Sequence, residues 1–221
     1  MNLKRLLSYI IPINIYQTNS EINKNLEVTW NNGQLVLDSK NTNFSYGSLQ
    51  RVMRIGLNAI GKNKIQNYNN TLILGVGGGS VISTLQKEFD FKGKIIGVEL
   101  DEKAIEIANQ YFGLNEFENT DIVIDDAYHF VKKASQKFDL IIIDIFQDKI
   151  MPDFLFENDF INTITKIVSK NGNVLFNTIA TLSTDFERNL AYQKIVGTKF
   201  KNVVKLSKIE GDNELFILSN D

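Results

Sequence analysis

Short apolar runs alternate with helix-like stretches through most of this chain. Five such runs are Thr71–Gly75, Lys94–Val98, Asp121–Ile124, Leu140–Asp144 and Asn173–Asn177. Near-continuous apolar strands with helices between them predict a mostly parallel sheet that is covered on both faces. Two later runs, Asn202–Leu206 and Glu214–Leu218, have only a polar turn between them and must pair antiparallel. We therefore predict an α/β fold whose mostly parallel, seven-stranded sheet ends in an antiparallel β-hairpin.

The residues before this alternation carry a different pattern. Leu26–Trp30 and Gln34–Asp38 alternate apolar and polar side chains on either side of Asn31-Asn32-Gly33, which is a strong hairpin signal. An earlier strand is expected near Ile13–Gln17. From Gly47 to Ile60 the apolar residues fall at helical spacing. These patterns predict a small β unit followed by a helix.

The chain divides into two predicted parts. Residues 1–65 form the small N-terminal β-hairpin unit with its helix, and residues 66–221 form the larger α/β domain. The 221 residues, of which 43% are hydrophobic and 23% charged, are ample for a folded core. The net charge of −2 provides no overall basic field, so we expect neither nucleic acid nor a membrane surface as a partner.

The use of cysteine and histidine excludes several kinds of site. The chain has no cysteine, which excludes a disulfide scaffold, a thiolate metal site and a cysteine nucleophile. His129 is the only histidine, so a multi-histidine metal site is excluded and we expect no metal. Lys4 and Arg5 precede an apolar run, but Pro12 interrupts it and no small-residue cleavage site follows. We therefore expect a cytoplasmic protein.

A glycine-rich turn follows the first apolar run of the larger domain. Gly75, Gly77, Gly78 and Gly79 precede Ser80, where a helix is predicted to begin. Glycines let the chain turn tightly and let its backbone approach a ligand closely. The N-terminus of the following helix presents unpaired N–H groups and a partial positive charge. The strand, turn and helix together predict a site for a nucleoside-type cofactor.

Carboxylates follow the next two apolar runs. Glu99 lies 24 positions after Gly75, near the spacing at which an acid takes both hydroxyls of a ribose. Asp101 is better placed to cap the helix that begins at Glu102. Asp126 follows the third run, where it can bind a purine amino group, cap the next helix, or do both.

Asp144 ends the fourth run and is predicted to face the crevice where open α/β sheets bind ligands. A carboxylate at this place can orient a substrate or accept a proton, and the alternative is an acid that only begins a loop. Asp148 lies in the polar loop that follows, which is bounded by Pro152. We take Asp148 as the second candidate carboxylate for catalysis.

Taken together, these residues resemble the spermidine synthase-like branch of the class I S-adenosylmethionine-dependent methyltransferase fold, which is Rossmann-like. The resemblance covers most of the chain, including the small N-terminal β unit and the antiparallel hairpin. The motifs that carry it are Gly75-Val76-Gly77-Gly78-Gly79, Val98-Glu99-Leu100-Asp101, Asp126-Ala127 and Phe138-Asp139-Leu140-Ile141 leading to Asp144.

This resemblance implies a transferase that uses S-adenosylmethionine or decarboxylated S-adenosylmethionine, with a small molecule such as an amine as the acceptor. The residues implied to bind the donor are Gly75, Gly77, Gly78, Gly79, Glu99, Leu100, Asp126 and Ala127. Asp144 matches the family's catalytic aspartate, which holds the attacking amine and removes its proton. The resemblance also implies a homodimer that forms through the N-terminal β unit.

Two departures from the family pattern leave the reaction open. The family's second aspartate would fall at Gln147, and Asp148 is one position late. Acids that grip a polyamine near the N-terminal tyrosine are absent from Asn43–Leu49, although a multiple cation normally needs several of them. We therefore favour methyl transfer to an unidentified small acceptor, with aminopropyl transfer from decarboxylated S-adenosylmethionine as the alternative.

Two alternative functions belong to other classes of protein. A nicotinamide dehydrogenase would use a similar loop, but Ser80 stands at the position of its third glycine and the terminal hairpin does not fit. A non-catalytic nucleoside-binding or scaffold protein would keep the fold without the reaction.

Overall fold

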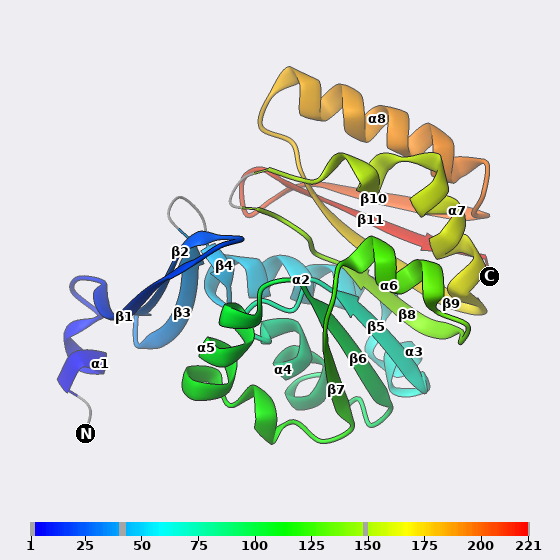
Figure 1. Ribbon diagram of the computed structural model, residues 1–221. Helices are drawn as coiled ribbons and strands as arrows, with labels where there is room; N and C mark the ends of the chain where they lie inside the picture. The colour runs from blue at the N-terminus through cyan, green and yellow to red at the C-terminus, as the bar shows by residue number, and fades with distance from the viewer. Residues whose placement is uncertain (1–2, 40–42, 148–149, 221) are drawn as a thin grey trace.

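The computed structural model describes residues 3–39, 43–147 and 150–220, which form two sheets with helices around the larger one (Figure 1). The smaller sheet is antiparallel and contains β1 (Ile13–Ser20), β2 (Lys24–Asn31), β3 (Gln34–Ser39) and β4 (Asn43–Ser45), in that order. Asn32 and Gly33 connect β2 to β3, and both have positive φ angles, 48° and 76°. A two-residue hairpin turn of this kind requires positive φ at both positions, so the predicted hairpin is confirmed.

The larger sheet has seven strands in the order β10-β11-β9-β8-β5-β6-β7. The strands are β5 (Asn70–Leu74), β6 (Lys94–Glu99), β7 (Thr120–Ile124), β8 (Phe138–Ile143), β9 (Val168–Ile179), β10 (Asn202–Ile209) and β11 (Asn213–Ser219). Strands β5 to β9 are parallel, whereas β11 pairs antiparallel with both β9 and β10. The predicted α/β fold, with its terminal antiparallel hairpin, is confirmed.

Helices cover both faces of the larger sheet (Figure 1). They are α2 (Gly47–Ile60), α3 (Lys62–Gln66), α4 (Ser80–Lys87), α5 (Glu102–Phe112), α6 (Ala127–Lys133), α7 (Asn158–Ile167) and α8 (Ser183–Gly197), with short 3₁₀ turns at Leu114–Glu116 and Asp153–Phe156. Helix α1 (Leu3–Leu7) lies beside the smaller sheet instead. One core cluster contains side chains of α2, α3, α4 and α5, and another contains those of α6, α7 and α8. Alternate residues of β8 supply the two clusters, because successive strand side chains point to opposite faces.

Helix α2 packs on the larger sheet although it follows the smaller one in the chain. A β-carbon added at Gly56 would meet Leu175 of β9 at 2.6 Å and Leu215 of β11 at 3.2 Å. Val52, Met53 and Leu57 are fully buried in the same core cluster. This close packing places the first turn of α2 at the edge of the sheet where the candidate site lies. The division of the chain at residue 65 remains a prediction.

The smaller sheet is fastened to α5. Leu26, Val28 and Leu37 form a buried cluster with Ala104 and Ile107 of that helix. The side chain of Asp101 accepts the Lys103 N–H at 3.0 Å, which confirms the predicted cap of α5. Asn23 also donates to Asp101, at 2.7 Å. The same carboxylate therefore caps a helix and joins the two sheets.

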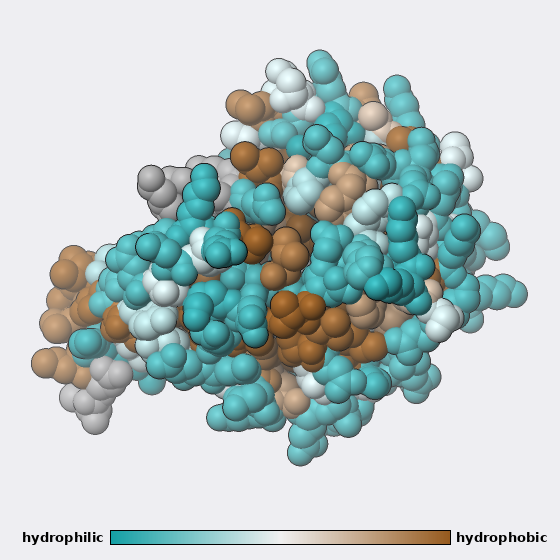
Figure 2. All heavy atoms as spheres, viewed as in Figure 1, coloured by the Kyte–Doolittle hydropathy of each residue, from teal (hydrophilic) through white to brown (hydrophobic). Residues whose placement is uncertain are grey.

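Exposed apolar side chains gather over the N-terminal segment, at the left of Figure 2. Leu3, Tyr9, Ile10 and Ile11 are each more than half exposed. The segment is short, and across residues 3–39, 43–147 and 150–220 no helix has both the length and the apolar character needed to cross a membrane.

Candidate functional site

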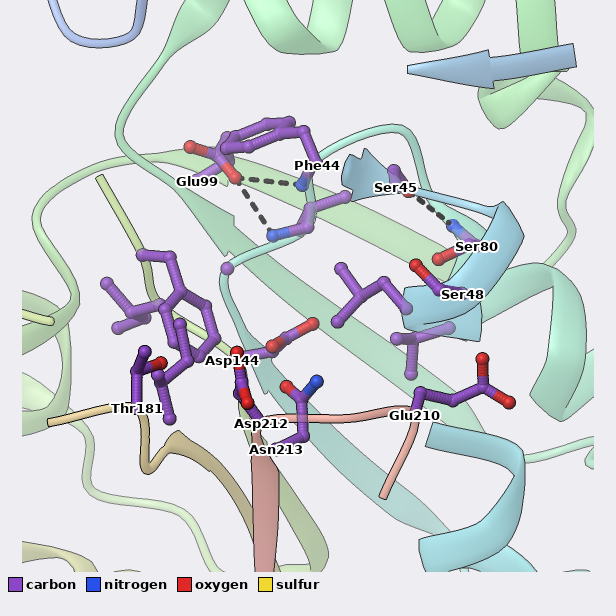
Figure 3. Close-up of a pocket in the computed structure, with 18 residues that line it drawn as sticks. Phe44, Ser45, Ser48, Ser80, Glu99, Asp144, Thr181, Glu210, Asp212 and Asn213 are labelled. Carbon is purple, nitrogen blue, oxygen red and sulfur yellow. Dashed lines mark hydrogen bonds between the residues drawn. The ribbon is translucent and has the colours of Figure 1, made fainter. Parts of the chain in front are cut away.

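A cavity of about 400 Å³ lies at the carboxyl ends of β5 and β8 (Figure 3). Three walls of different origin enclose it. The glycine turn contributes Gly75, Val76, Gly77 and Ser80; the N-terminal unit contributes Phe44, Ser45, Ser48 and Leu49; and the end of the chain contributes Glu210, Asp212 and Asn213. Glu99, Asp144 and Thr181 also line it. The cavity thus joins segments that are far apart in the sequence.

The glycine turn needs glycine for both conformation and space. Gly75 has a φ of +89°, and a β-carbon there would lie 2.1 Å from the backbone oxygen of Asp144. Gly77 has a φ of +53°, and its β-carbon would lie 3.2 Å from the backbone oxygen of Phe44. Residues other than glycine rarely adopt such φ angles, and other atoms already occupy the space that a side chain would need. The turn is therefore packed between β8 and the N-terminal unit.

Glu99 is buried against the glycine turn. Its Oε2 accepts the N–H groups of Val76 and Gly77, each at 2.9 Å, and its Oε1 accepts the Asp101 N–H at 3.0 Å. Burial raises the pKa of Glu99, against the lowering effect of these three N–H groups. Each carboxylate oxygen has two acceptor positions, so one position on Oε1 stays free. One further donor can bind there without breaking a bond of the turn, and the predicted contact of Glu99 with both hydroxyls of a ribose stays a prediction.

Replacing Glu99 by glutamine is expected to weaken donor binding by about 10- to 100-fold, which is the effect of losing a charge-assisted hydrogen bond. The side-chain amide of glutamine would also place its N–H donors beside the backbone N–H groups that Glu99 now accepts. Calorimetric titration with a donor analogue measures the change. Glu102→Gln, which removes an exposed acid three residues further on, is the matched control. Equal affinity in the two variants would contradict a donor role for Glu99.

Asp144 lies just after β8 and is partly buried in the cavity. Its Oδ1 accepts a hydrogen bond from Asn177 Nδ2 at 3.0 Å. Burial raises the pKa of Asp144 to about 7, although the Asn177 amide lowers it, and the nearby Glu99 adds to the rise. A carboxylate with a near-neutral pKa can exchange a proton with a substrate at physiological pH. Asp144 is therefore suited to act as a general base.

The two residues predicted to hold an adenine, Asp126 and Ala127, lie outside this cavity and follow β7. The Asp126 side chain accepts the His129 N–H at 2.9 Å and so caps α6. Ala127 is the buried first residue of that helix. Leu100 and Ile124 are 41% and 46% exposed, and Ile124 pairs with Glu99 across the strands. The exposed apolar pair therefore borders the same strand end as Glu99.

The structure separates the predicted site residues into three sets. Gly75, Gly77, Glu99 and Asp144 line one cavity. Gly78, Gly79, Leu100, Asp126 and Ala127 do not line it; a β-carbon at Gly78 would contact Ser45, and one at Gly79 would contact Leu114. Asp148 lies outside the residues that the structure describes.

Sequence reasoning missed several polar residues of the site. Asn177 is fully buried in β9 and contacts Asp144, and its only sequence signal is a polar side chain within a buried strand. Asp212 and Glu210 reach the cavity from the turn between β10 and β11. Their turn was predicted, but no local pattern indicates that it folds over the glycine turn.

Known proteins are similar to this chain in sequence and in fold. A family model described as the spermine/spermidine synthase domain matches residues 53–205. A polyamine aminopropyltransferase of Vibrio vulnificus is 31% identical over 129 residues, which are 57% of this chain and 43% of that protein. The eEF1A lysine and N-terminal methyltransferase homolog of Drosophila pseudoobscura is 26% identical over 201 residues, 83% of this chain and 29% of that protein. The chain spans less than half the length of these two relatives.

Solved structures with low sequence identity share the fold. Spermidine synthase of Thermotoga maritima superposes with a TM-score of 0.75 at 19% identity, over 95% of this chain and 73% of that one. Human methyltransferase-like protein 13, in complex with SAH, superposes with a TM-score of 0.67 at 21% identity, over 79% of this chain and 83% of that one. The strand order and these neighbours define a Rossmann-like protein of the class I methyltransferase fold. Because the family model covers more than half of the sequence, the chain belongs to the spermine/spermidine synthase family.

Proposed function

We propose that the protein transfers an aminopropyl group from decarboxylated S-adenosylmethionine to an amine. The observation that carries the proposal is the charge of the cavity. Glu99, Asp144, Glu210 and Asp212 line it, and no lysine, arginine or histidine is among the described residues that do. A sulfonium donor and an amine acceptor are both cations, and a cavity lined by carboxylates attracts and holds cations.

The charge of the cavity also favours a donor without a carboxylate. The carboxylate of S-adenosylmethionine would enter a space lined by four acids, of which only Glu210 has an ion-pair partner among the described residues, Arg51. Decarboxylation removes this repulsion. Glu99 would bind the ribose, and the exposed Leu100 and Ile124 would form an apolar platform for the base beside Asp126. This arrangement agrees with the family of the chain, and we therefore favour aminopropyl transfer over the methyl transfer that the sequence favoured.

Asp144 would act on the acceptor. When bound, the sulfonium centre of the donor supplies an electrophilic carbon. The unprotonated nitrogen of the amine forms a bond to that carbon, the carbon–sulfur bond breaks, and the sulfur keeps the electron pair as a neutral thioether. The carboxylate of Asp144, held by Asn177, positions the amine and takes the proton that its nitrogen releases. Holding the two reactants in line is the larger part of the rate enhancement.

Methyl transfer is the second candidate, because the similarity to a lysine and N-terminal methyltransferase homolog covers 83% of the chain. A methyltransferase would use the same glycine turn with an intact donor. The two reactions release different products, methylthioadenosine after aminopropyl transfer and S-adenosylhomocysteine after methyl transfer.

Calorimetric binding of the two donors tests the proposal. Decarboxylated S-adenosylmethionine is expected to bind about tenfold more tightly than the intact donor, because its affinity carries no penalty from a carboxylate among acids. Incubation with 1,4-diaminobutane should then release methylthioadenosine, detected by mass spectrometry. Tighter binding of the intact donor with release of S-adenosylhomocysteine would establish methyl transfer instead. Failure to bind either donor would overturn both enzymatic interpretations.

A further inference from the structure

We propose that the outer face of α8 binds the same face of α8 in a second copy of this chain, so that two antiparallel helices hold a symmetric dimer. In this pair, Glu187 of each copy binds Lys194 of the other. The inference does not depend on the proposed function. Helix α8 lies at the top of Figure 1, on the outside of the molecule.

The outer face of α8 carries a ridge of exposed apolar side chains. Leu182 lies immediately before the helix, and Phe186 and Leu190 follow at intervals of four residues; they are 64%, 51% and 51% exposed. Residues four apart form a ridge along a helix, and such a ridge packs into the groove of a facing helix. Ala191, beside Leu190, is also exposed, and its small side chain allows a second helix to come close.

The inner face of α8 is fixed by buried hydrogen bonds, so the helix cannot turn its ridge inward. Asn189 is fully buried, and its Nδ2 donates to Glu214 at 2.9 Å and to Thr178 at 3.0 Å. Arg188 donates to the backbone oxygen of Ile179 at 2.7 Å. Rotation of the helix would break these bonds and leave buried polar groups without partners, which is costly. The ridge therefore stays on the surface of a single chain.

The start of the ridge is ordered by a cap. Asp185 accepts the N–H groups of Thr181 at 3.1 Å and of Leu182 at 2.9 Å. These bonds hold the first turn of α8 and the residue before it in one conformation. A surface that is already ordered loses little conformational entropy when it binds a partner. The ridge is therefore prepared for association.

The charged side chains of α8 fall into two pairs. Asp185 and Arg188 form an ion pair with each other at 3.0 Å. Glu187 and Lys194 are exposed, and neither has a hydrogen-bond or ion-pair partner within the described part of the chain. Seven residues are about two helical turns, so these two side chains share one face but lie roughly 10 Å apart along the axis. They are too far apart to pair with each other.

Symmetry turns these two charges into partners. In an antiparallel pair with its two-fold axis between positions 190 and 191, Glu187 of one copy lies opposite Lys194 of the other. The contact occurs twice, because every contact of a two-fold interface is repeated. Leu190 then lies beside Ala191 of the second copy, next to the axis. A parallel pair would place like charges opposite each other, so the charges favour the antiparallel arrangement.

Sedimentation equilibrium of charge-reversed variants tests the inference. Wild type is expected to be a dimer at micromolar concentration. Glu187→Lys and Lys194→Glu should each raise the dimer dissociation constant by about 10- to 100-fold, because both ion pairs become repulsive. The double variant, with both substitutions, should associate as wild type does. Lys170→Glu reverses an exposed charge of β9 and is the matched control, which should leave the dissociation constant unchanged.

A cross-link tests the position of the axis. The chain has no cysteine, so Ala191→Cys introduces its only thiol. Two such thiols on either side of the axis are within reach of a disulfide, and mild oxidation should give a covalent dimer on a non-reducing gel. Lys170→Cys, with an exposed thiol elsewhere on the surface, should stay a single chain under the same conditions.

Three results would overturn the inference. The first is a wild-type protein that stays monomeric at micromolar concentration. The second is a dimer whose dissociation constant is the same in both single variants, which would place the interface elsewhere, for example at the N-terminal β unit. The third is a double variant that associates no better than the single ones although its circular dichroism matches wild type. Recovery of the dimer in the double variant would support the pairing of Glu187 with Lys194.

Discussion

Replacing Asp144 by asparagine is expected to lower kcat by about 100-fold or more while donor affinity stays close to that of wild type. Asparagine keeps the size of the side chain but cannot accept the proton of the attacking amine. Single-turnover rates, with donor affinity measured separately, show whether the loss lies in the chemical step. Asp139→Asn is the matched control, because Asp139 lies at the opposite end of β8, where it binds the N–H groups of Asn69 and Asn70. Unchanged turnover in Asp144→Asn would remove its assigned role.

Because the pKa of Asp144 is raised, wild type and Asp144→Asn should also differ in the pH dependence of the rate and of stability. The carboxylate is the active form, so the rate of wild type should rise with pH through about 7, and the residual rate of the variant should not. Stability should also depend on pH. Between pH 3.8, the ordinary pKa, and about 7, Asp144 is protonated in the folded state but ionised in the unfolded state. Wild type therefore loses stability as pH rises through this window. At pH 8 the variant, with no buried charge, should unfold at a higher temperature than wild type.

Replacing Gly75 by alanine is expected to abolish donor binding and to destabilise the fold by about 3 kcal/mol or more. The new β-carbon would lie 2.1 Å from the backbone oxygen of Asp144, and alanine would also be forced to a φ of +89°. Backbone atoms cannot move aside as a flexible side chain can, so the glycine turn and the end of β8 would both shift. Urea denaturation and donor calorimetry measure the two effects.

Alanine substitutions at two other glycines separate the effect of backbone strain from that of the steric clash. Gly61 has a φ of +104°, and a β-carbon added there would have no neighbouring atom within 4 Å, so Gly61→Ala tests backbone strain without a clash. Gly197, at the end of α8, also has open space, and Gly197→Ala should be neutral or stabilising by up to about 1 kcal/mol. Both variants should keep full donor affinity. A Gly75→Ala protein that binds donor normally would contradict the assigned role of the turn.

The local part of the fold could be predicted from the sequence because it depends on short-range patterns. Helical spacing predicts Gly47–Ile60, and the structure has α2 at those bounds. Asp101 and Asp126 precede apolar helical stretches, and both cap helices. Helix α8 was not predicted, because only Asn189, Tyr192 and Val196 are buried in it and its apolar pattern is weak.

The site could be predicted only in part, because its walls meet through tertiary contacts. Gly75, Glu99 and Asp144 all follow parallel strands, and the carboxyl ends of such strands share one edge of the sheet. Ser45 and Asp212 reach the same cavity from an antiparallel sheet and from a hairpin, and no spacing rule relates them to Asp144. No sequence pattern predicts the ion pair between Arg51 and Glu210 either.

Strand β11 lies between β9 and β10, although it follows both in the chain. On the ribosome, β10 therefore emerges without a neighbour to pair with, and it stays so until residues up to Ser219 have also left the exit tunnel. The same late event brings Asp212 over the cavity. A nascent chain can thus fold its glycine turn early but cannot complete the cavity until synthesis has passed the hairpin.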